Sequence, residues 1–335
     1  MRVGPEFELI SRLAERIREA HGEPSGRTRI GIGDDAAVTV PGGATATSVD
    51  MLVEGVHFRR ETALPRSIGR KALAVALSDL AAMGADAGEA YVALGVPPGV
   101  SEDDCLELYG GLAELSAEAG VALLGGDVSA APVLIVAVTV VGHAASPDDL
   151  VGRAGARPGQ ALAVTGELGG AAAGLVLLER PELEGSLEPA VAAGLRRRQL
   201  EPPVRLAAGA ALAAAEAAAM IDVSDGLGAD AEQVSAASGV SMRIELEGLP
   251  VQPGVAELAA AAGLDPIDLA AGSGEDYELL VALDPERIPA AVAGVGRTGT
   301  TLSVIGEVVE GRGVELRGPD GHLRSPAGFQ HLAVR

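Results

Sequence analysis

The stretch VALLGGDVSAAPVLIVAVTVVG, residues 121–142, predicts two strands joined by a glycine-rich bend. Its second half is rich in β-branched residues, which favour a sheet. The polar, turn-rich segment AASPDDLVGRAGARPGQ, residues 144–160, follows it. Because turn-forming residues cluster there, we place a domain boundary in this segment, with an N-terminal domain at 1–146 and a C-terminal domain at 147–335.

Helical and strand patterns are interspersed on the N-terminal side of this boundary. Apolar residues from Phe7 to Ile17 lie on one face of a predicted helix. The segment GGATATSVDMLVEGVHF, residues 42–58, alternates like a strand, and RSIGRKALAVALSDLAAMGA, residues 66–85, is typical of a long helix. A further helix is predicted at 101–120, where Ser101 and an acidic first turn suit the positive end of a helix dipole.

The C-terminal side shows the same mixture. ALAVTGELGG (161–170), VSMRIELEGL (240–249) and GSGEDYELLVAL (272–283) indicate strands, and helices are expected from Ala171 and from Val204. The connections do not repeat as uniform βαβ units. We therefore predict an α+β (α/β mixed) fold in both halves, with each sheet covered by helices on one face.

Composition narrows the classes of protein. The 335 residues carry 47 acidic and 25 basic side chains, a net charge of −22, which argues against nucleic-acid binding. The apolar runs stay below the roughly 18 residues of a membrane span, and the first residues lack a signal-peptide pattern. Cys105, the single cysteine, suits a buried thiol in a helix. We expect a soluble cytoplasmic protein.

Several common binding motifs are excluded by their own residues. GIGDDA, residues 31–36, matches a dinucleotide fingerprint, but its two aspartates would face the pyrophosphate. Lys71, the single lysine, lies in GRKAL and not in a Walker A loop. DVSDG, residues 222–226, has its glycine one place too early for an EF-hand, and the five histidines are scattered.

What remains is a recurring pattern of aspartates at strand ends and turns, beside glycine or serine. They are Asp34, Asp35, Asp50, Asp79, Asp127, Asp222 and Asp225. Taken singly, each is explained as a helix cap or a turn former. Together they suit hard cations such as Mg²⁺, which take oxygen ligands, and ATP can bind so acidic a site only with metal between.

The motifs that carry these aspartates resemble those of the thiamine-monophosphate kinase family, in the aminoimidazole ribonucleotide synthetase-like superfamily. The matching segments run in order from the first residues to beyond Leu280: GPEFELI, GIGDDAAV, SVDMLVEGVHF, KALAVALSDLAAMGA, GVALLGGD, RAGARPGQ, IDVSDGL and GEDYELL. VEGVHF and GEDYEL separate this kinase family from its superfamily relatives.

The resemblance implies a two-domain subunit and a homodimer whose N-terminal sheets form an intersubunit barrel. The N-terminal domain would bind ATP and Mg²⁺ and dimerise, and the C-terminal domain would complete an active site near the interdomain cleft. The implied reaction converts ATP and thiamine monophosphate to ADP and thiamine diphosphate. Both reactants are anionic, so several Mg²⁺ ions would neutralise their repulsion and align them.

The resemblance also implies roles for single residues. The positions that match metal ligands are Asp35, Ser48, Asp50, Asp79, Asp127, Asp222 and Asp225, with Asp34 as an alternative helix cap beside Asp35. The positions that match ATP contacts are Tyr109, Gly126, Asp127, Arg153 and Ser224, where Tyr109 is alternatively a core tyrosine. No catalytic residue is implied, because direct transfer needs no protein nucleophile.

His57, Glu275 and Phe329 match substrate-binding positions. The alternatives are a histidine that closes a strand and a phenylalanine that anchors the tail. Val49 and Ser273 depart from the family pattern, which leaves the metal count and the turn before Glu275 open. Two other functions remain: another ATP-dependent synthetase of the superfamily, or a non-catalytic nucleotide- or metal-binding relative.

Overall fold

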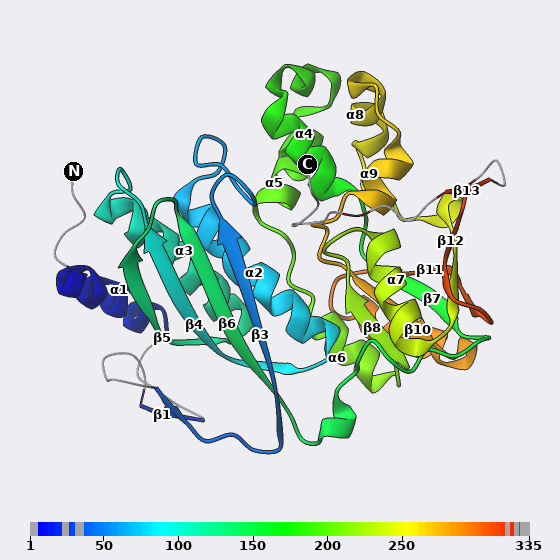
Figure 1. Cartoon of the computed structure of the whole chain (residues 1–335), viewed down its shortest axis with the longest axis horizontal. Coiled ribbons are helices and arrows are strands. Elements are labelled where there is room, and N and C mark those ends of the chain that lie inside the picture. The colour runs from blue at the N-terminus through cyan, green and yellow to red at the C-terminus, as the bar shows by residue number, and fades with distance from the viewer. Residues whose placement is uncertain (1–5, 22–26, 31–36, 319–321, 325–327, 329–335) are drawn as a thin grey trace. The chain divides into compact units, whose positions relative to one another are not determined.

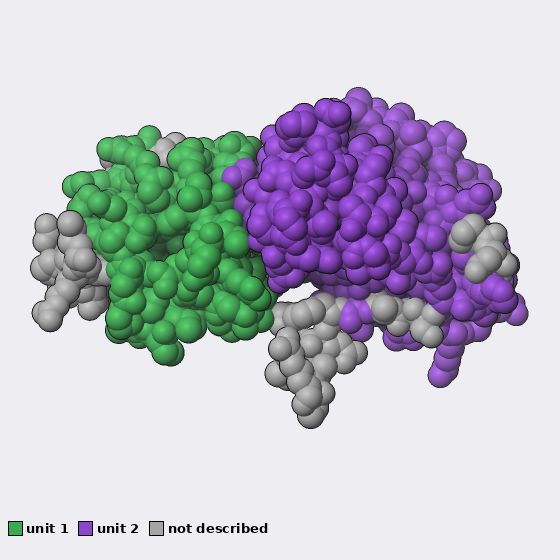
Figure 2. Space-filling view, turned by 90° about the horizontal axis from the view of Figure 1, so that it is seen from above, with its two compact units in different colours: residues 1–80, 85–147 green, residues 81–84, 148–335 purple. Residues whose placement is uncertain are grey.

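The computed structural model describes residues 6–21, 27–30, 37–318, 322–324 and 328. The chain divides into two compact units, coloured separately in Figure 2. Unit 1 comprises residues 1–80 and 85–147, and unit 2 comprises residues 81–84 and 148–335. Among the described residues, no helix combines the length and the apolar character that a membrane-spanning segment needs.

The described residues of unit 1 form a four-stranded sheet, a small two-stranded sheet and three helices (Figure 1). The helices are α1 (Glu6–His21), α2 (Pro65–Ala82, whose last residues count with unit 2) and α3 (Glu102–Ala119). The strands are β1 (Thr28–Ile30), β2 (Val38–Thr39), β3 (Ala44–Val53), β4 (Asp86–Val96), β5 (Ala122–Ala130) and β6 (Ile135–Ala144).

The four-stranded sheet has the order β3-β6-β4-β5, in which β4 and β5 are parallel and the other neighbours are antiparallel. α2 and α3 cover one face of it (Figure 1). β3 alternates along its length: Ser48 and Asp50 share the half-buried face, while Val49 and Met51 are 65% and 53% exposed. The sheet of unit 1 is therefore covered by helices of its own unit on one face, as predicted.

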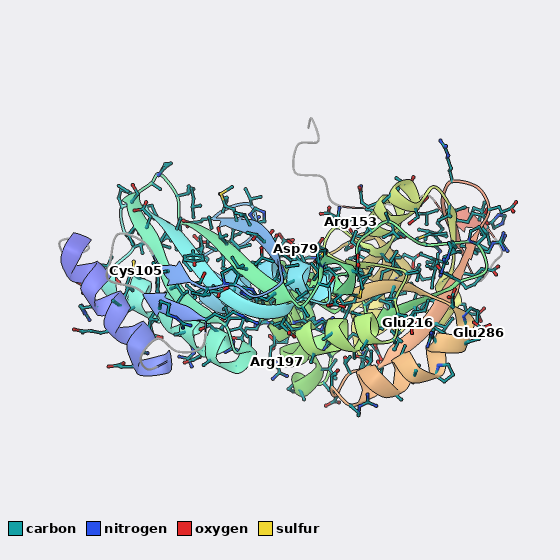
Figure 3. The ribbon with its side chains drawn as sticks, turned by 90° about the horizontal axis from the view of Figure 1, so that it is seen from below. Asp79, Cys105, Arg153, Arg197, Glu216 and Glu286 are labelled. Carbon is teal, nitrogen blue, oxygen red and sulfur yellow. The ribbon has the colours of Figure 1, made fainter. Side chains whose placement is uncertain are left out.

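α3 begins as its sequence predicts. The Ser101 hydroxyl accepts the backbone N–H of Asp104 at 3.1 Å, and the Asp104 carboxylate accepts the N–H of Ser101 at 2.9 Å. This reciprocal capping satisfies donors that the first turn leaves unpaired. Cys105 is buried in the same turn, which confirms the prediction of a buried thiol (Figure 3).

Unit 2 is built on a seven-stranded sheet with the order β13-β12-β9-β11-β7-β10-β8. β12 and β9 are parallel, and the other neighbouring strands are antiparallel. The strands are β7 (Ala161–Thr165), β8 (Ala219–Asp222), β9 (Ser241–Glu245), β10 (Leu279–Leu283), β11 (Leu302–Val309), β12 (Gly313–Arg317) and β13 (Leu323–Arg324). The helices are α4 (Gly170–Glu179), α5 (Pro189–Leu200), α6 (Leu206–Ala214), α7 (Leu227–Ser238), α8 (Val255–Ala262), α9 (Pro266–Gly272) and α10 (Ile288–Gly296). Short 3₁₀ turns lie at Pro147–Asp149, Pro181–Ser186, Leu246–Gly248 and Pro285–Arg287.

The central strands of unit 2 are buried on both faces, which corrects the expectation of helices on one face only. Leu280 and Ala282 of β10 join one hydrophobic cluster with residues of α7 and α9. Leu279, Val281 and Leu283 join another with residues of α6 and α10. A strand without polar alternation, LLVAL, requires apolar layers on both sides. The two-domain fold of mixed helices and sheets is confirmed.

Candidate functional site

Three of the predicted metal ligands meet in unit 1, where β3 faces α2. The Ser48 hydroxyl donates a hydrogen bond to the Asp79 carboxylate. Asp50, two residues along the same face of β3, is hydrogen-bonded to Asp79 as well. Burial, the charge of Asp79 and this hydrogen bond together raise the pKa of Asp50 to about 6. Asp79, labelled in Figure 3, thus joins a serine and a second aspartate into one group.

This group has the donor chemistry that a hard divalent cation requires. All three side chains offer oxygen, the ligand atom that Mg²⁺ takes. The pKa of Asp50 is raised by burial and by the neighbouring charge of Asp79, and a bound cation would offset the repulsion between the two side chains. The described residues contain no group of three or more histidine, cysteine, aspartate or glutamate side chains placed to hold a metal ion. Asp34 and Asp35 lie outside the described residues.

Gly126 and Asp127 lie on β5, at the far edge of the same sheet. A Cβ on Gly126 would lie 1.9 Å from the Val92 carbonyl oxygen of β4, so strand pairing by itself requires glycine there. β6 and β4 separate β5 from β3, and three strand spacings place Asp127 on the order of 14 Å from Asp50. Asp50 and Asp127 of one unit 1 are therefore too far apart to bind the same ion.

Two further predicted residues of unit 1 are placed by tight local structure. His57 lies in the turn 55–57, in which Gly55 has φ 83° and the Gly55 N–H donates to the Phe58 carbonyl at 2.8 Å. The His57 Nδ1 accepts the Val53 N–H at 3.0 Å, so a neutral ring carries its proton on Nε2. Tyr109 is buried in α3, where burial, then Cys105 and Asp127, raises the pKa of its hydroxyl. Its burial matches the core position given above as the alternative to an adenine contact.

In unit 2, Asp222 ends β8 beside Leu279 of β10, and the 223–226 loop leads from it into α7. The carboxylate of Asp230, in the first turn of α7, accepts hydrogen bonds from the backbone of this loop. Its Oδ2 accepts the backbone N–H groups of Ser224, Asp225 and Gly226 at 3.0, 3.0 and 3.1 Å. Burial, followed by the charge of Asp222, raises the pKa of Asp230 to about 7. Asp230 thus fixes the loop that carries Ser224 and Asp225.

Asp230 was not among the residues predicted from the sequence. It lies in the first turn of α7, where an acid is expected to favour the helix dipole, and that expectation alone gave no sign of the loop contact. In the sequence, the only sign of this contact was an acidic residue that follows Ser224, Asp225 and Gly226 by six, five and four positions.

A second loop, 274–278, lies directly against the 223–226 loop. The N–H of Glu275 donates to the Ser224 carbonyl at 2.8 Å, and the N–H of Tyr277 donates to the Val223 carbonyl at 2.8 Å. The N–H of Val223 donates in return to the Glu278 carbonyl at 2.7 Å. Backbone pairing therefore ties the predicted substrate residue Glu275 to the predicted ATP contact Ser224.

The two departures from the family pattern have little effect on the local structure. Ser273 ends α9 with φ −99°, a conformation open to any residue, and its hydroxyl donates to the Asp268 carbonyl at 3.2 Å. Val49 points away from the face of Asp50 and is 65% exposed. Serine at 273 therefore fits the turn before Glu275 without strain.

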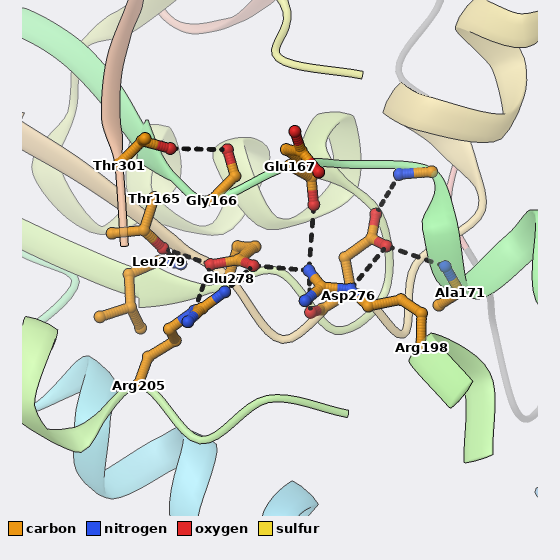
Figure 4. A network of polar contacts seen from close by, with 11 residues as sticks. Thr165, Gly166, Glu167, Ala171, Arg198, Arg205, Asp276, Glu278, Leu279 and Thr301 are labelled. Atoms are coloured by element: carbon orange, nitrogen blue, oxygen red, sulfur yellow. Dashed lines mark hydrogen bonds and ion pairs between the residues drawn. The ribbon is translucent and has the colours of Figure 1, made fainter. Parts of the chain in front are cut away.

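Behind the 274–278 loop lies a network of buried charges (Figure 4). Glu278 is fully buried and accepts hydrogen bonds from Arg205 at 2.6 and 2.7 Å, from Arg198 at 2.5 Å and from the Thr165 hydroxyl at 2.7 Å. Asp276 accepts the N–H groups of Gly169 at 2.7 Å and Ala171 at 3.2 Å. Arg198, Arg205, Thr165 and the N–H groups at the start of α4 thereby fix the carboxylates of Asp276 and Glu278 within the loop. None of these residues was predicted from the sequence.

Arg153, the last of the predicted ATP contacts, is exposed in the segment that precedes β7 (Figure 3). The carbonyl of its neighbour Gly152 accepts the N–H of Met220 on β8 at 3.0 Å, two residues before Asp222. The backbone carbonyl of Arg153 accepts a hydrogen bond from the Ser238 hydroxyl at 3.0 Å. Arg153 is therefore anchored beside the strand that ends in Asp222. Phe329 lies outside the described residues.

Comparison with known proteins identifies the class. Residues 33–144 match the N-terminal domain, and residues 157–318 the C-terminal domain, of the AIR synthase related proteins. The two-unit fold with its acidic turns is thus that of an AIR synthase related protein.

The similar proteins within this class agree with one another. A thiamine-monophosphate kinase of Mycobacterium tuberculosis is 38% identical over 87% of this chain and 84% of its own, and one of Caulobacter vibrioides is 38% identical over 92% and 85%. A crystal structure of the enzyme from Stenotrophomonas maltophilia has a TM-score of 0.83 at 34% identity, covering 93% of this chain and 97% of its own. The structure described as "AaThiL complexed with AMPPCP and TMP" has a TM-score of 0.77 at 32% identity and covers 99% of both chains. The chain belongs to the thiamine-monophosphate kinase family.

Proposed function

We propose that this protein transfers the γ-phosphoryl group of ATP to thiamine monophosphate, giving ADP and thiamine diphosphate. One observation carries the proposal. A relative that matches 99% of this chain at 32% identity has been solved with an ATP analogue and TMP together. The names of the curated relatives agree with this activity.

The charge of the reactants explains the need for the acidic groups. The γ-phosphate of ATP and the acceptor phosphate are both anionic, so they repel each other as they approach. Bound Mg²⁺ ions supply the positive charge that offsets this repulsion. In unit 1, Ser48, Asp50 and Asp79 would hold such an ion, because their oxygen atoms lie together and the pKa of Asp50 is raised in the absence of a cation.

The remaining proposed ligands belong to other parts of the chain. They are Asp127 on β5, Asp222 and Asp225 around the 223–226 loop, and Asp35 outside the described residues. Asp50 and Asp127 of one unit 1 are separated by two intervening strands, which supports more than one ion.

The protein's own groups bind and orient the two substrates. Arg153 offers a planar fork for phosphate oxygens, and Ser224 offers a hydroxyl on a loop fixed by Asp230. Gly126 and Tyr109 are the further proposed ATP contacts, and His57, Glu275 and Phe329 the proposed acceptor contacts. The acceptor phosphate is already ionised near neutral pH, so it attacks the γ-phosphorus directly and no phosphoenzyme forms. Rate enhancement then comes from positioning and electrostatics.

We also propose that the protein is a cytoplasmic homodimer. Unit 1 (1–146 in the predicted division) would bind ATP and pair with a second copy, and the rest of the chain would complete the site. The apolar side chains of Val49 and Met51, 65% and 53% exposed on the edge strand β3, support a partner sheet at this edge. Light scattering on the purified chain tests this: twice the monomer mass is expected, and a monomer would contradict it.

The activity is tested by incubating the purified protein with ATP, Mg²⁺ and thiamine monophosphate. ADP and thiamine diphosphate should appear in equal amounts, and excess EDTA should stop both. ADP release without thiamine monophosphate would favour another synthetase of the superfamily, and absence of ADP under all these conditions would favour a non-catalytic relative.

A further inference from the structure

The last turn of α5 contacts the 274–278 loop through two consecutive residues. Arg198 donates to the Asp276 carbonyl at 3.0 Å and to the Glu278 carboxylate at 2.5 Å. Gln199 donates from Nε2 to the Glu275 Oε2 at 2.6 Å. Gln199 is 5% exposed, so its amide is held in place by packing. α5 therefore fixes both the backbone of this loop and the side chain of Glu275.

The loop needs such support because its backbone is strained. Gly274, Glu275 and Tyr277 have φ of 71°, 61° and 50°, and two of these three are not glycine. A left-handed conformation is unfavourable for residues with a Cβ and persists only where the surroundings impose it. Strain of this kind concentrates at functional sites. The loop is thus held in one conformation that presents Glu275.

The orientation of the Gln199 amide follows from its partner. A carboxylate accepts hydrogen bonds, so the NH₂ group of Gln199 must face Glu275. The other amide atom, Oε1, is then buried without a hydrogen-bond partner in the described structure. An unpaired buried acceptor costs folding free energy, and an apolar side chain of the same shape would avoid that cost. Stability alone therefore does not account for glutamine at this position.

We propose that Gln199 is a positioning residue for the acceptor substrate, which it serves by orienting the carboxylate of Glu275. This rests on the proposed function, in which Glu275 binds the acceptor. A carboxylate repels the acceptor's phosphate and attracts a cationic or N–H-donating heterocycle. Gln199 thereby favours phosphate esters that carry such a heterocycle.

The test compares steady-state kinetics of the wild type and Gln199→Met. Methionine keeps the length of glutamine and removes the donor. The KM for thiamine monophosphate should rise about tenfold, as expected for a lost hydrogen bond to a charged group. The KM for ATP and kcat should stay within about twofold, and the thermal midpoint should not fall. Arg197→Ala, on the exposed side of the same turn, is the matched control and should leave all of these values unchanged.

A double-mutant cycle with Glu275→Ala separates positioning from a general structural role. If Gln199 acts through Glu275, Gln199→Met adds no further loss of thiamine monophosphate affinity in the Glu275→Ala background, measured by calorimetry with a non-hydrolysable ATP analogue. Additive losses would overturn the inference, as would an unchanged KM in active Gln199→Met. If Gln199→Met does not fold, Gln199→Ala, which cannot overpack, carries the same test. A wild type that forms no thiamine diphosphate would instead overturn the proposed function, and the inference with it.

Discussion

Two groups of acids in this molecule, one fully buried and one half-buried, differ in the partners of their carboxylates. In unit 2, the Glu278 carboxylate is surrounded by Arg198, Arg205 and the Thr165 hydroxyl. In unit 1, Asp50 shares a hydrogen bond with another aspartate, Asp79, and its pKa is raised to about 6. A buried carboxylate paired with arginine makes the fold sensitive to the loss of either partner, because the remaining charge is left buried. Two carboxylates that repel each other are suited to a cation that is supplied from outside.

The largest effect is expected when the neutralised group is broken. Glu278→Ala leaves the largely buried Arg205 without its carboxylate partner, and leaves Arg198 with only the Asp276 carboxylate, 4.0 Å from its Nε. The free energy of unfolding should fall by about 3–5 kcal/mol. Urea unfolding followed by circular dichroism measures this change, and a loss below about 1 kcal/mol would show that the network does not stabilise unit 2.

Asp79→Asn should instead lower turnover without lowering the free energy of unfolding. It removes a charge that the proposed cation needs, so kcat should fall by about 100-fold or more, equivalent to about 2.7 kcal/mol. The free energy of unfolding should not fall, because repulsion with Asp50 is relieved. Turnover assays over a range of Mg²⁺ concentrations check this. A kcat that is unchanged at saturating Mg²⁺ would remove Asp79 from the site.

The raised pKa of Asp50 predicts a pH dependence for the metal-free protein. The folded state binds this proton more tightly than the unfolded state, whose value lies near 3.8. The resulting stabilisation is complete below that value and is lost as the pH rises through about 6. Between pH 3 and pH 7, the wild type should therefore lose on the order of 2 kcal/mol relative to Asp50→Asn.

Urea unfolding in EDTA at several pH values measures this difference. Saturating Mg²⁺ should reduce it, because a bound cation replaces the proton. Parallel stability curves for the wild type and Asp50→Asn in EDTA would contradict the raised pKa.

The smallest effect is expected for an ion pair at the surface. The Arg287 Nη2 and Glu216 Oε2 atoms are 2.5 Å apart, but the two side chains are 47% and 66% exposed. Solvent screens such pairs, so Arg287→Ala should change the free energy of unfolding by less than about 1 kcal/mol. The same urea experiment measures it, and a loss as large as that of Glu278→Ala would show that burial does not distinguish the two arginine-carboxylate contacts.

Local patterns in the sequence were enough to predict much of the fold. The serine and acids of 101–104 predicted the start of α3, and the alternation within residues 42–58 predicted a strand, which the structure confirms as β3. The two-sided burial of β7, β8 and β10 was missed, because a short apolar strand does not show how many layers cover it.

Motifs in the sequence name candidate site residues, but contacts that depend on the backbone are not visible in them. Ser48, Asp50 and Asp79 come together as their motifs imply. Asp230 acts on three backbone N–H groups, and Gln199 reaches Glu275 from 76 residues away. Neither contact leaves a pattern in a single sequence, because both depend on tertiary packing.

The proposed reaction depends on a cation bound by the acids of unit 1. Anomalous diffraction from crystals grown with Mn²⁺, a non-hydrolysable ATP analogue and thiamine monophosphate would locate such a cation. We expect a Mn²⁺ peak within about 2.0–2.3 Å of carboxylate oxygens of Asp50 and Asp79. A nucleotide bound with its metal elsewhere, and Asp50 still hydrogen-bonded to Asp79, would contradict the account.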